Sequence, residues 1–331
     1  MRPDPIVDIV KSIGVTGAVF LHADFSAPWA INAHVDERDC ADFMPMPRQL
    51  IAYHVVLEGC CFVSVTDTAG RQYRHWAKAG DVLIFPHNTP HFLASEPGLP
   101  AVNGTDLVLP TMEDGFEQIR HGGGGDKTRI WCGFMGSNSG ASPLLDTLPA
   151  MMVIPVDRSD TRNWIRSSVT MAANRLSSDQ RRSTTLINGM CELLLAEALR
   201  ISVASAAEHN GWLNGMAHPR MAKALARIHS ALECPPSVAE LAREVGMSRS
   251  AFVERFTEVL GVGPRQYMLD ERMKLAAALL RDGQLTASEI ALRVGYDAPE
   301  AFSRAFKRQY GLAPRHWRVG CAQDHAATPV C

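Results

Sequence analysis

The chain has 331 residues, of which 46% are hydrophobic and 21% charged, and its formal net charge is −2. This length allows two domains, and the composition is that of an ordinary soluble protein with a sizeable core in each. The eight cysteines include no Cys-x-x-Cys pair, and the adjacent Cys60 and Cys61 have poor geometry for bridging each other. No stretch approaches the roughly eighteen apolar residues of a membrane span. We therefore expect reduced thiols, a cytoplasmic location and no membrane insertion.

The charge is unevenly distributed along the chain. Residues 220–320 carry sixteen Lys and Arg against eleven Asp and Glu, whereas the remainder carries seventeen against twenty-four. The last third is therefore basic, and this supports a polyanionic partner when motifs point the same way.

Short strands separated by turn signals are predicted up to about Pro155. The clearest strand segments are Tyr53–Leu57, Phe62–Thr66 and Asp81–Phe85. Such a series predicts a β-sandwich or barrel. The glycine-rich residues 121–127 lack the Gly-Lys-Ser/Thr ending of a phosphate loop and precede a strand-like segment, so we interpret them as a flexible hairpin tip.

The periodicity becomes helical from about Asp160, and a helix is predicted from Thr184 to Val203. One face of this helix is a wide apolar stripe formed by Ile187, Met190, Leu194, Ala198 and Ile201. The stripe must be covered, either by packing against the chain's own barrel or by a second chain in a homodimer. Periodicity alone does not distinguish the two. Residues 204–217, rich in Ala, Asn and Gly, are a plausible linker.

The last third contains the same helical pattern twice. Residues 239–246 recur as 288–295, and the Ala-Phe-x3-Phe-x4-Gly-x2-Pro-Arg pattern that begins at Ala251 recurs at Ala301. Two copies separated by about fifty residues are too few for a solenoid. A helix, a glycine turn and a second helix, present twice, predict two helix-turn-helix modules that bind successive turns of a DNA duplex.

Helix signals locate the reading helix of each module. In the first, Ser237 caps a helix, Gly246 makes the turn and Ser248 caps a helix that runs to about Leu260. In the second, Asp297 is the predicted cap and Pro299 lies in the first turn. Phenylalanines at helical spacing are predicted to be core. The residues predicted to face the DNA are Arg249, Ser250, Val253 and Glu254, then Glu300, Ser303, Arg304 and Lys307.

One helix, Pro264 to Leu280, is predicted between the modules. At 1.5 Å per residue it is about 25 Å long, comparable to the separation of about 34 Å between successive major grooves. Arg304 is the candidate for a bidentate guanine contact, and Arg315 the candidate for a phosphate contact. The alternative is a helical bundle that binds protein as an interaction scaffold.

Residues 295–318 resemble the C-terminal signature of AraC/XylS-type transcription regulators, and the resemblance extends over residues 219–318. It implies promoter binding by one helix-turn-helix in each of two major grooves. Pro299 and Ala301 depart from the pattern, because many members carry polar readers at these first-turn positions.

Residues 80–91, with Gly80, Pro86 and His91, resemble the second motif of cupin barrels, with Asn88 in place of its second glycine. The first cupin motif is represented by residues 57–59, with Gly59 as its final glycine. This alignment puts Ala52 at the position of the metal-binding Glu, and no His-x-His is found near residues 45–48. A metal would have only His91 and His54, with His87 in reach by sequence, which is too few for zinc. We therefore expect no metal and no cofactor.

The barrel of the cupin-type subgroup is taken to sense an effector, and residues 129–134 resemble the end of that barrel. The candidate effector-binding residues are Tyr53, His54, Trp76, Phe85, His91 and Trp131. A cupin-type metal enzyme fused to a DNA anchor is the alternative function, but it needs the ligands that are missing here.

The predicted fold is α+β, with an N-terminal cupin-like β-barrel, connecting helices and an all-α double helix-turn-helix domain. The expected domains are a sensing domain (1–157), a helical dimerisation and linker region (158–217), a DNA-binding domain (218–320) and a flexible tail (321–331). The expected function is effector-responsive transcription regulation without enzyme activity. The expected partners are promoter DNA, a small-molecule effector, RNA polymerase if the protein is an activator, and a second copy of the chain.

Overall fold

The computed structural model describes residues 4–36, 39–40, 47, 49–109, 117–137, 145, 148–155, 184–205 and 212–318. The chain divides into two compact units, a β unit (Gly14–Asn138 and Leu144–Ala198) and a helical unit (Met1–Ile13, Ser139–Pro143 and Leu199–Cys331). Helix α1 (Pro5–Ile13) groups with the helical unit, where it contacts α6 (Pro219–His229), although it precedes all the strands in sequence. The predicted tail 321–331 and, within the predicted region 158–217, residues 158–183 and 206–211 lie outside the described residues.

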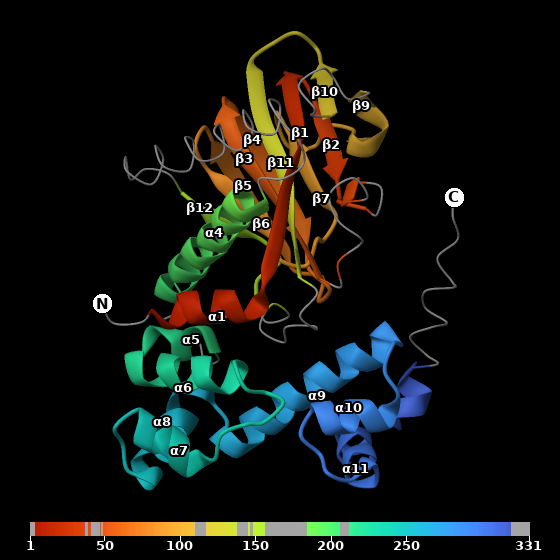
Figure 1. Cartoon of the computed structure of the whole chain (residues 1–331). Coiled ribbons are helices and arrows are strands. Elements are labelled where there is room, and N and C mark those ends of the chain that lie inside the picture. The colour runs from red at the N-terminus through yellow and green to blue at the C-terminus, as the bar shows by residue number, and fades with distance from the viewer. Residues whose placement is uncertain are drawn as a thin grey trace. The chain divides into compact units, whose positions relative to one another are not determined.

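The β unit consists of two sheets (Figure 1). In spatial order, the seven-stranded sheet contains β12 (Met152–Ile154), β6 (Val82–Phe85), β3 (Gln49–Glu58), β11 (Lys127–Ser137), β1 (Val15–Ser26), β10 (Glu117–Gly122) and β9 (Val108–Leu109). The five-stranded sheet contains β5 (Gln72–Lys78), β4 (Cys60–Thr66), β7 (His91–Ala94), β2 (Ala30–Ala33) and β8 (Val102–Asn103). A short 3-10 helix, η1 (Gly104–Leu107), follows β8.

The core of the β unit lies between the two sheets. Alternation along β1 turns Leu21, Ala23 and Phe25 into this core and leaves Asp24 on the outer face. The other sheet contributes Val63 from β4 together with residues of β2 and β7. Within the described residues the strands form a two-sheet sandwich rather than one closed barrel, and the predicted α+β fold with a cupin domain is confirmed.

Helix α4 (Thr184–Ser205) packs on the outer face of the seven-stranded sheet. Gly17 allows a close approach, because a Cβ there would lie 2.1 Å from Cys191 Sγ. The Gly17 N–H donates to Asn188 Oδ1 at 3.0 Å, and Tyr53 of β3 hydrogen-bonds Cys191. β3 is therefore covered on both faces, which explains why almost every residue in it is buried.

This docking bears on the predicted dimer stripe. Met190, Leu194 and Ala198 are buried within the single chain, whereas Leu193 is 49% exposed. A second chain has no access to these three side chains, so their burial favours packing inside the chain over a dimer seam. Ile201 is half-buried, and the side chain of Ile187 lies outside the described residues.

The glycine loop, Gly122–Asp126, is neither a hairpin tip nor a phosphate loop. β10 and β11 lie on opposite sides of β1 and do not pair with each other, so the loop crosses over the end of β1. Its N–H groups are used there: Gly123 donates to Ser26 O, Gly124 to Ser26 Oγ and Gly125 to Ala27 O, at 2.8 to 3.0 Å. The predicted flexible hairpin tip was wrong, because the glycines serve close packing.

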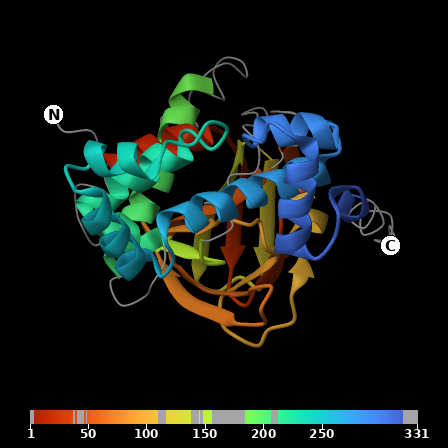
Figure 2. The same cartoon turned by 90° about the horizontal axis from the view of Figure 1, so that it is seen from below.

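The helical unit contains two groups of helices connected by α9 (Pro264–Asp282), as Figures 1 and 2 show. The first group is α5 (Trp212–Ala217), α6, α7 (Val238–Glu244) and α8 (Arg249–Leu260); the second is α10 (Ala287–Arg293) and α11 (Pro299–Tyr310). α7 begins with a capping box at Ser237, and α10 with another at Thr286. None of the described helices is long and apolar enough to cross a membrane.

The predicted caps are confirmed with one exception. Ser248 caps α8, and Gly283 ends α9 in the left-handed conformation. The N-cap of α11 is Ala298, without a side-chain hydrogen bond, and the predicted cap Asp297 was one residue too early. Pro299 is at the first helical position, which needs no N–H.

We expect Gly122→Ala to destabilise the β unit much more than Gly124→Ala. Both glycines have positive φ, of 134° and 89°, so alanine is strained at both by about 1 kcal/mol or more. Only at Gly122 does a Cβ collide with the chain, 1.8 Å from Ser26 O, whereas nothing lies within 4 Å at Gly124; this overpacking adds about 1–3 kcal/mol. Chemical unfolding of the two variants measures the difference, and equal losses would show that the loop is not packed on β1.

Candidate functional site

The outward face of α8 carries the residues predicted to read DNA in the first module. Arg249, Ser250, Val253 and Glu254 are all exposed, whereas Phe252 and Phe256 are fully buried. Thr257 is exposed one turn further along, although its hydroxyl donates to Val253 O within the helix. This face is mixed in character, with apolar, hydroxyl and charged groups.

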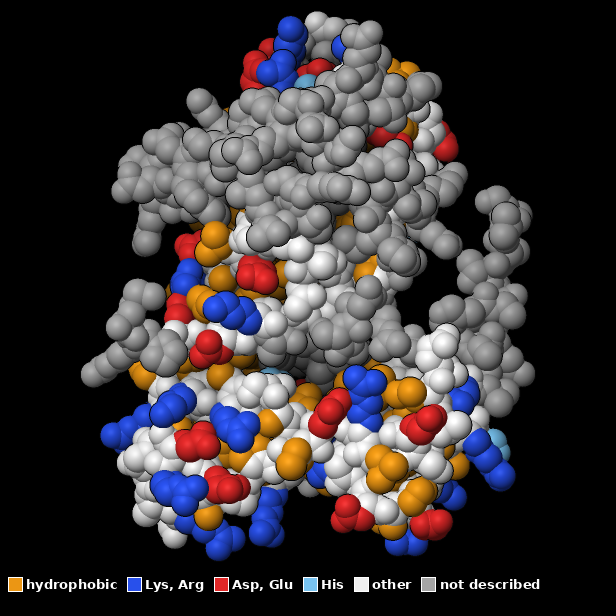
Figure 3. Space-filling model, in the orientation of Figure 1, with side chains coloured by type: hydrophobic (Ala, Val, Ile, Leu, Met, Phe, Trp, Pro, Cys, Tyr) orange, Lys and Arg blue, Asp and Glu red, His pale blue; other side chains and the backbone are white. Residues whose placement is uncertain are grey.

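The outward face of α11 is more basic. Glu300, Arg304 and Lys307 are exposed and Ser303 is half-buried, while Phe302 and Phe306 fill the core. Arg308, which the sequence analysis did not single out, is exposed beside Lys307. Arg315 is exposed beyond the helix. In Figure 3, Lys and Arg side chains lie along the lower margin of the helical unit, with Asp and Glu side chains among them.

Each helix-turn-helix turn is held by a cation from an earlier helix. Lys223 of α6 donates from Nζ to Glu244 O at 2.7 Å, at the end of α7. Arg272 of α9 donates from Nε to Val294 O at 2.5 Å and from Nη2 to Gly295 O at 2.6 Å, after the end of α10. These carbonyls have no partner within their helix, so the cations satisfy them and oppose the negative end of the helix dipole.

The two cations occupy equivalent positions in the duplication. Lys223 and Arg272 are forty-nine residues apart, the same spacing that relates Ala239 to Ser288. Neither cation was predicted, because the repeat is evident in sequence only in the helix pair around each glycine turn. Extending the comparison to the preceding helix would have aligned the two cations.

Arg272 also belongs to a joint between the two modules. Its guanidinium lies over the Tyr296 ring at 4.7 Å, and burial lowers its pKa. Glu233, in the loop after α6, accepts from Arg293 Nε at 2.8 Å. A Cβ at Gly295 would lie 2.8 Å from Glu233 O and 2.9 Å from Arg272 Nη2, whereas a Cβ at the equivalent Gly246 meets nothing within 4 Å. The turn of the second module is thus packed against the first.

A directed chain of hydrogen bonds lies inside the β unit. His91 Nδ1 is 2.9 Å from Thr89 O, so this nitrogen carries a proton and His91 Nε2 accepts. His54 Nε2, 2.6 Å away, is then the donor, which makes His54 Nδ1 the acceptor for the Cys132 thiol at 3.0 Å. The order is Cys132 to His54 to His91 to Thr89 O, and every member is neutral.

The pKa shifts agree with this neutral chain. Burial lowers the pKa of His54 well below its usual value, with a contribution from His91, and burial lowers that of His91 to about 4. Burial also raises the pKa of the Cys132 thiol, which therefore keeps its proton. The Phe85 ring stacks on His91 with centroids 3.6 Å apart.

Only part of the predicted effector set comes together. His54, Phe85 and His91 are buried on the inner faces of their strands. Tyr53 faces α4, Trp76 is 52% exposed on the edge strand β5 against Phe62, and Trp131 is half-buried on the outer face of β11 beside His22. These three were wrongly grouped with His54, Phe85 and His91, because strand alternation turns their side chains away from the inner faces.

The motif around His91 is explained by backbone geometry. Asn88 has φ 47°, a left-handed conformation that the motif normally gives to glycine and that Asn tolerates. Its side chain accepts from Val35 N at 3.2 Å and donates to Val35 O at 2.7 Å. His87 is directed elsewhere, with Nε2 2.9 Å from Leu148 O. Among the described residues no group of three or more His, Cys, Asp or Glu is arranged to hold a metal ion.

Comparison with known proteins gives consistent matches over most of the chain. Residues 4–204 match the model of the Cupin family and residues 241–319 that of a helix-turn-helix domain. A putative AraC-like transcription regulator of Streptomyces lividans is 33% identical over 95% of this chain and 98% of its own length. The HTH-type transcriptional regulator AlkR of Acinetobacter baylyi is 26% identical over 95% and 99%. A solved structure of the DNA-binding domain of AdpA with a target DNA is 27% identical, covers 39% of this chain and 96% of its own, and has a TM-score of 0.28.

Arg272→Ala is expected to destabilise the helical unit by about 2–3 kcal/mol, because it leaves two carbonyls without their charged donor. Arg272→Lys should retain part of the stability lost in Arg272→Ala, because a lysine ammonium cannot donate to both carbonyls in the forked geometry of a guanidinium. Arg281→Ala, at an exposed position on the same helix, is the control and should change stability by less than about 0.5 kcal/mol. Chemical unfolding followed by circular dichroism provides the measurement, and equal effects at the two positions would contradict the assigned role.

The free energy of unfolding is expected to fall as the pH drops from about 6.5 towards 4. Unfolded histidine binds a proton near pH 6.5, whereas His91 in the folded chain does so only near 4, so acid favours the unfolded state. The free energy of unfolding should change in this range by about 1.4 kcal/mol per pH unit for each such histidine. A His54→Leu, His91→Leu double variant should have a shallower slope than the wild type in urea unfolding between pH 7 and 5. Identical slopes for wild type and double variant would refute this.

Proposed function

We propose that this chain, which belongs to the AraC-like transcription regulators and has an N-terminal cupin domain, binds promoter DNA sequence-specifically. We further propose that a small-molecule effector controls this activity. The duplicated helix-turn-helix, with two exposed faces on α8 and α11, is the observation that carries the DNA-binding part. α9 has nineteen residues, about 28 Å at 1.5 Å each, which suits successive major grooves about 34 Å apart.

The two modules differ in how they recognise DNA. α8 presents Val253 and Ser250 with Glu254, groups suited to a thymine methyl, a base edge and a cytosine amino group. α11 presents Arg304 with Lys307 and Arg308, and a guanidinium can donate two hydrogen bonds to guanine. We infer that Arg304 is the main base reader of the second module, and that Arg315 contacts phosphate.

The effector is proposed to bind the cupin domain. His54, Phe85 and His91 are the three predicted lining residues that share the inner face, and we retain them as the candidate set. Neutral imidazoles and an aromatic wall suit an organic molecule better than a hard cation. The relatives are transcription regulators, and we propose that this chain, like them, is not an enzyme.

The remaining partners are proposals of the same kind. RNA polymerase is a partner if the protein activates transcription, and a cytoplasmic location follows from DNA binding in a bacterial cell. A homodimer would double the DNA contacts and raise avidity. Its interface would have to use residues other than Met190, Leu194 and Ala198, which are buried within the chain.

Arg304→Ala is expected to cost about 1–3 kcal/mol on the specific site and to relax preference at one base position, because a bidentate base contact is lost. Arg315→Ala should weaken specific and random DNA alike and reduce the salt slope by about one. A binding selection from random duplexes, with salt titrations on the selected site, measures both.

The two variants are matched controls for each other, since each removes one exposed arginine of the same module. Arg243→Ala, on the exposed side of α7, adds a control outside the proposed reading faces. Equal loss of base preference in the Arg304 and Arg315 variants would overturn the assignment of base and phosphate roles. A wild type whose affinity for duplex DNA does not vary with salt would favour the protein scaffold instead.

A further inference from the structure

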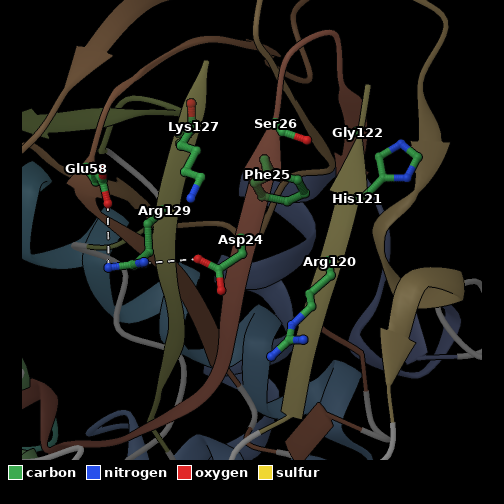
Figure 4. A pocket seen from close by; sticks show the side chains of 10 residues that line it. Asp24, Phe25, Ser26, Glu58, Arg120, His121, Gly122, Lys127 and Arg129 are labelled. Atoms are coloured by element: carbon green, nitrogen blue, oxygen red, sulfur yellow. Dashed lines mark hydrogen bonds and ion pairs between the residues drawn. The ribbon is translucent and has the colours of Figure 1, made fainter. Parts of the chain in front are cut away.

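A hollow of about 410 Å³ lies on the outer face of the seven-stranded sheet, beside the glycine loop. Figure 4 shows its side chains: Asp24 of β1 lies between Arg129 of β11 and Arg120 of β10, with Lys127 and Glu58 on the side of β11. All these residues belong to the β unit, and none is part of the inner cluster around His54 and His91.

The floor of the hollow is a row of alternating charges across four neighbouring strands. The strand register aligns Glu58 with Arg129, Arg129 with Asp24, and Asp24 with Arg120. Arg129 Nε donates to Asp24 Oδ1 at 2.9 Å, and its Nη1 lies 3.5 Å from Glu58 Oε2. The hydrogen bond that Arg129 donates to Asp24 raises the pKa of Arg129. Arg129 is therefore shared by both carboxylates and has little capacity for a ligand.

The rim of the hollow is fixed by the glycine loop. Its three N–H groups donate to Ser26 and Ala27, and Ala27 N donates back to Asp126 O at 2.9 Å. These bonds hold Gly122 and Lys127 in place at the two ends of the loop. Because the loop N–H groups are occupied, an anion in the hollow must be bound by side chains rather than by the backbone.

Two cations in the hollow have no acidic partner among the described residues. Lys127 makes no ion pair there, and Arg120 has only a neutral contact, from Nη2 to Gln118 Oε1 at 3.3 Å. On the same floor Asp24 uses Oδ1 for Arg129, which leaves Oδ2 as an acceptor. The hollow thus combines two cations that make no ion pair, an excess of one positive charge over its two carboxylates, and an Asp24 oxygen that Arg129 does not use.

We propose that this hollow binds a small α-amino or α-hydroxy carboxylate, with the ligand's carboxylate on Arg120 and Lys127 and its amino or hydroxyl group donating to Asp24. Arginine suits a planar carboxylate, and an ammonium adds a second point charge. The flanking Asp24 and Glu58 repel a polyanion such as nucleic acid, and they disfavour a dianionic phosphate more than a monoanionic carboxylate. The site lies outside the inner cluster and stands whether or not it controls DNA binding.

The test is calorimetric titration of the full-length protein at low ionic strength with L-alanine, L-lactate and inorganic phosphate. Arg120→Gln with Lys127→Gln removes both cations from exposed positions. The matched control is Arg74→Gln with Lys78→Gln on β5, where Arg74 likewise contacts a glutamine two residues earlier, at 2.6 Å, outside the hollow. The control also accounts for anions bound by the basic helical unit, since neither pair of changes alters that unit.

We expect at least one of the two acids to bind, with a Kd raised at least tenfold in the Arg120, Lys127 variant and less than twofold in the control. Hydrogen exchange in a peptide spanning residues 117–131 should slow when the acid is added to the wild type. No binding of either acid, or equal loss in both variants, would overturn the site. Phosphate binding that depends on Arg120 and Lys127, without carboxylate binding, would overturn the ligand class. Binding to duplex DNA should be unchanged in both variants, so the outcome is independent of the proposed regulation.

Discussion

The carbonyl groups at the ends of α7 and α10 need donors from outside their own helices, and the helical unit is arranged to supply them. Lys223 reaches the first turn from α6, and Arg272 reaches the second from α9. In each module the donor comes from the helix that precedes the helix pair, so the angle between the pair is tied to that third helix. The exposure of the reading faces on α8 and α11 follows, because Phe252, Phe256, Phe302 and Phe306 are then directed into the core.

The two helix-turn-helix modules could be predicted almost completely from the sequence, since their signals are local. Helix α1 was not predicted, and α5 lies within the predicted linker 204–217. Capping by Ser237 and Ser248 and the turn at Gly246 depend on residues a few positions apart, and the second copy repeats the first cap at Thr286 and the turn at Gly295. The error at Asp297 arose because Asp is a favoured N-cap residue, whereas the N-cap here is Ala298, which has no capping side chain. The contact between Glu233 and Arg293 was not predictable, because it joins residues of different modules and has no counterpart in the repeat.

The β unit was predicted at the level of its class but not of its interior. Alternation along a strand normally separates an inner from an outer face, but β3 is buried on both, so Tyr53 and His54 looked equivalent in sequence. Only the docking of α4 on Gly17 shows that Tyr53 faces a helix. The prediction for the glycine loop was wrong for a related reason. A run of glycines indicates a flexible segment when only neighbouring residues are considered, whereas here it permits contact with a turn about a hundred residues earlier. The order of protons from Cys132 to Thr89 likewise depends on three strands and a loop that are distant in sequence.

Because each three-helix module completes its own turn with its own cation, neither reading face takes part in holding the fold together. Substitutions on the outward side of α8 are then nearly free of structural cost, and so are those on α11. If α8 and α11 read DNA as we propose, the mixed face of one and the basic face of the other can therefore change separately. One half of the recognised sequence could then change while the other half still keeps the protein on its DNA.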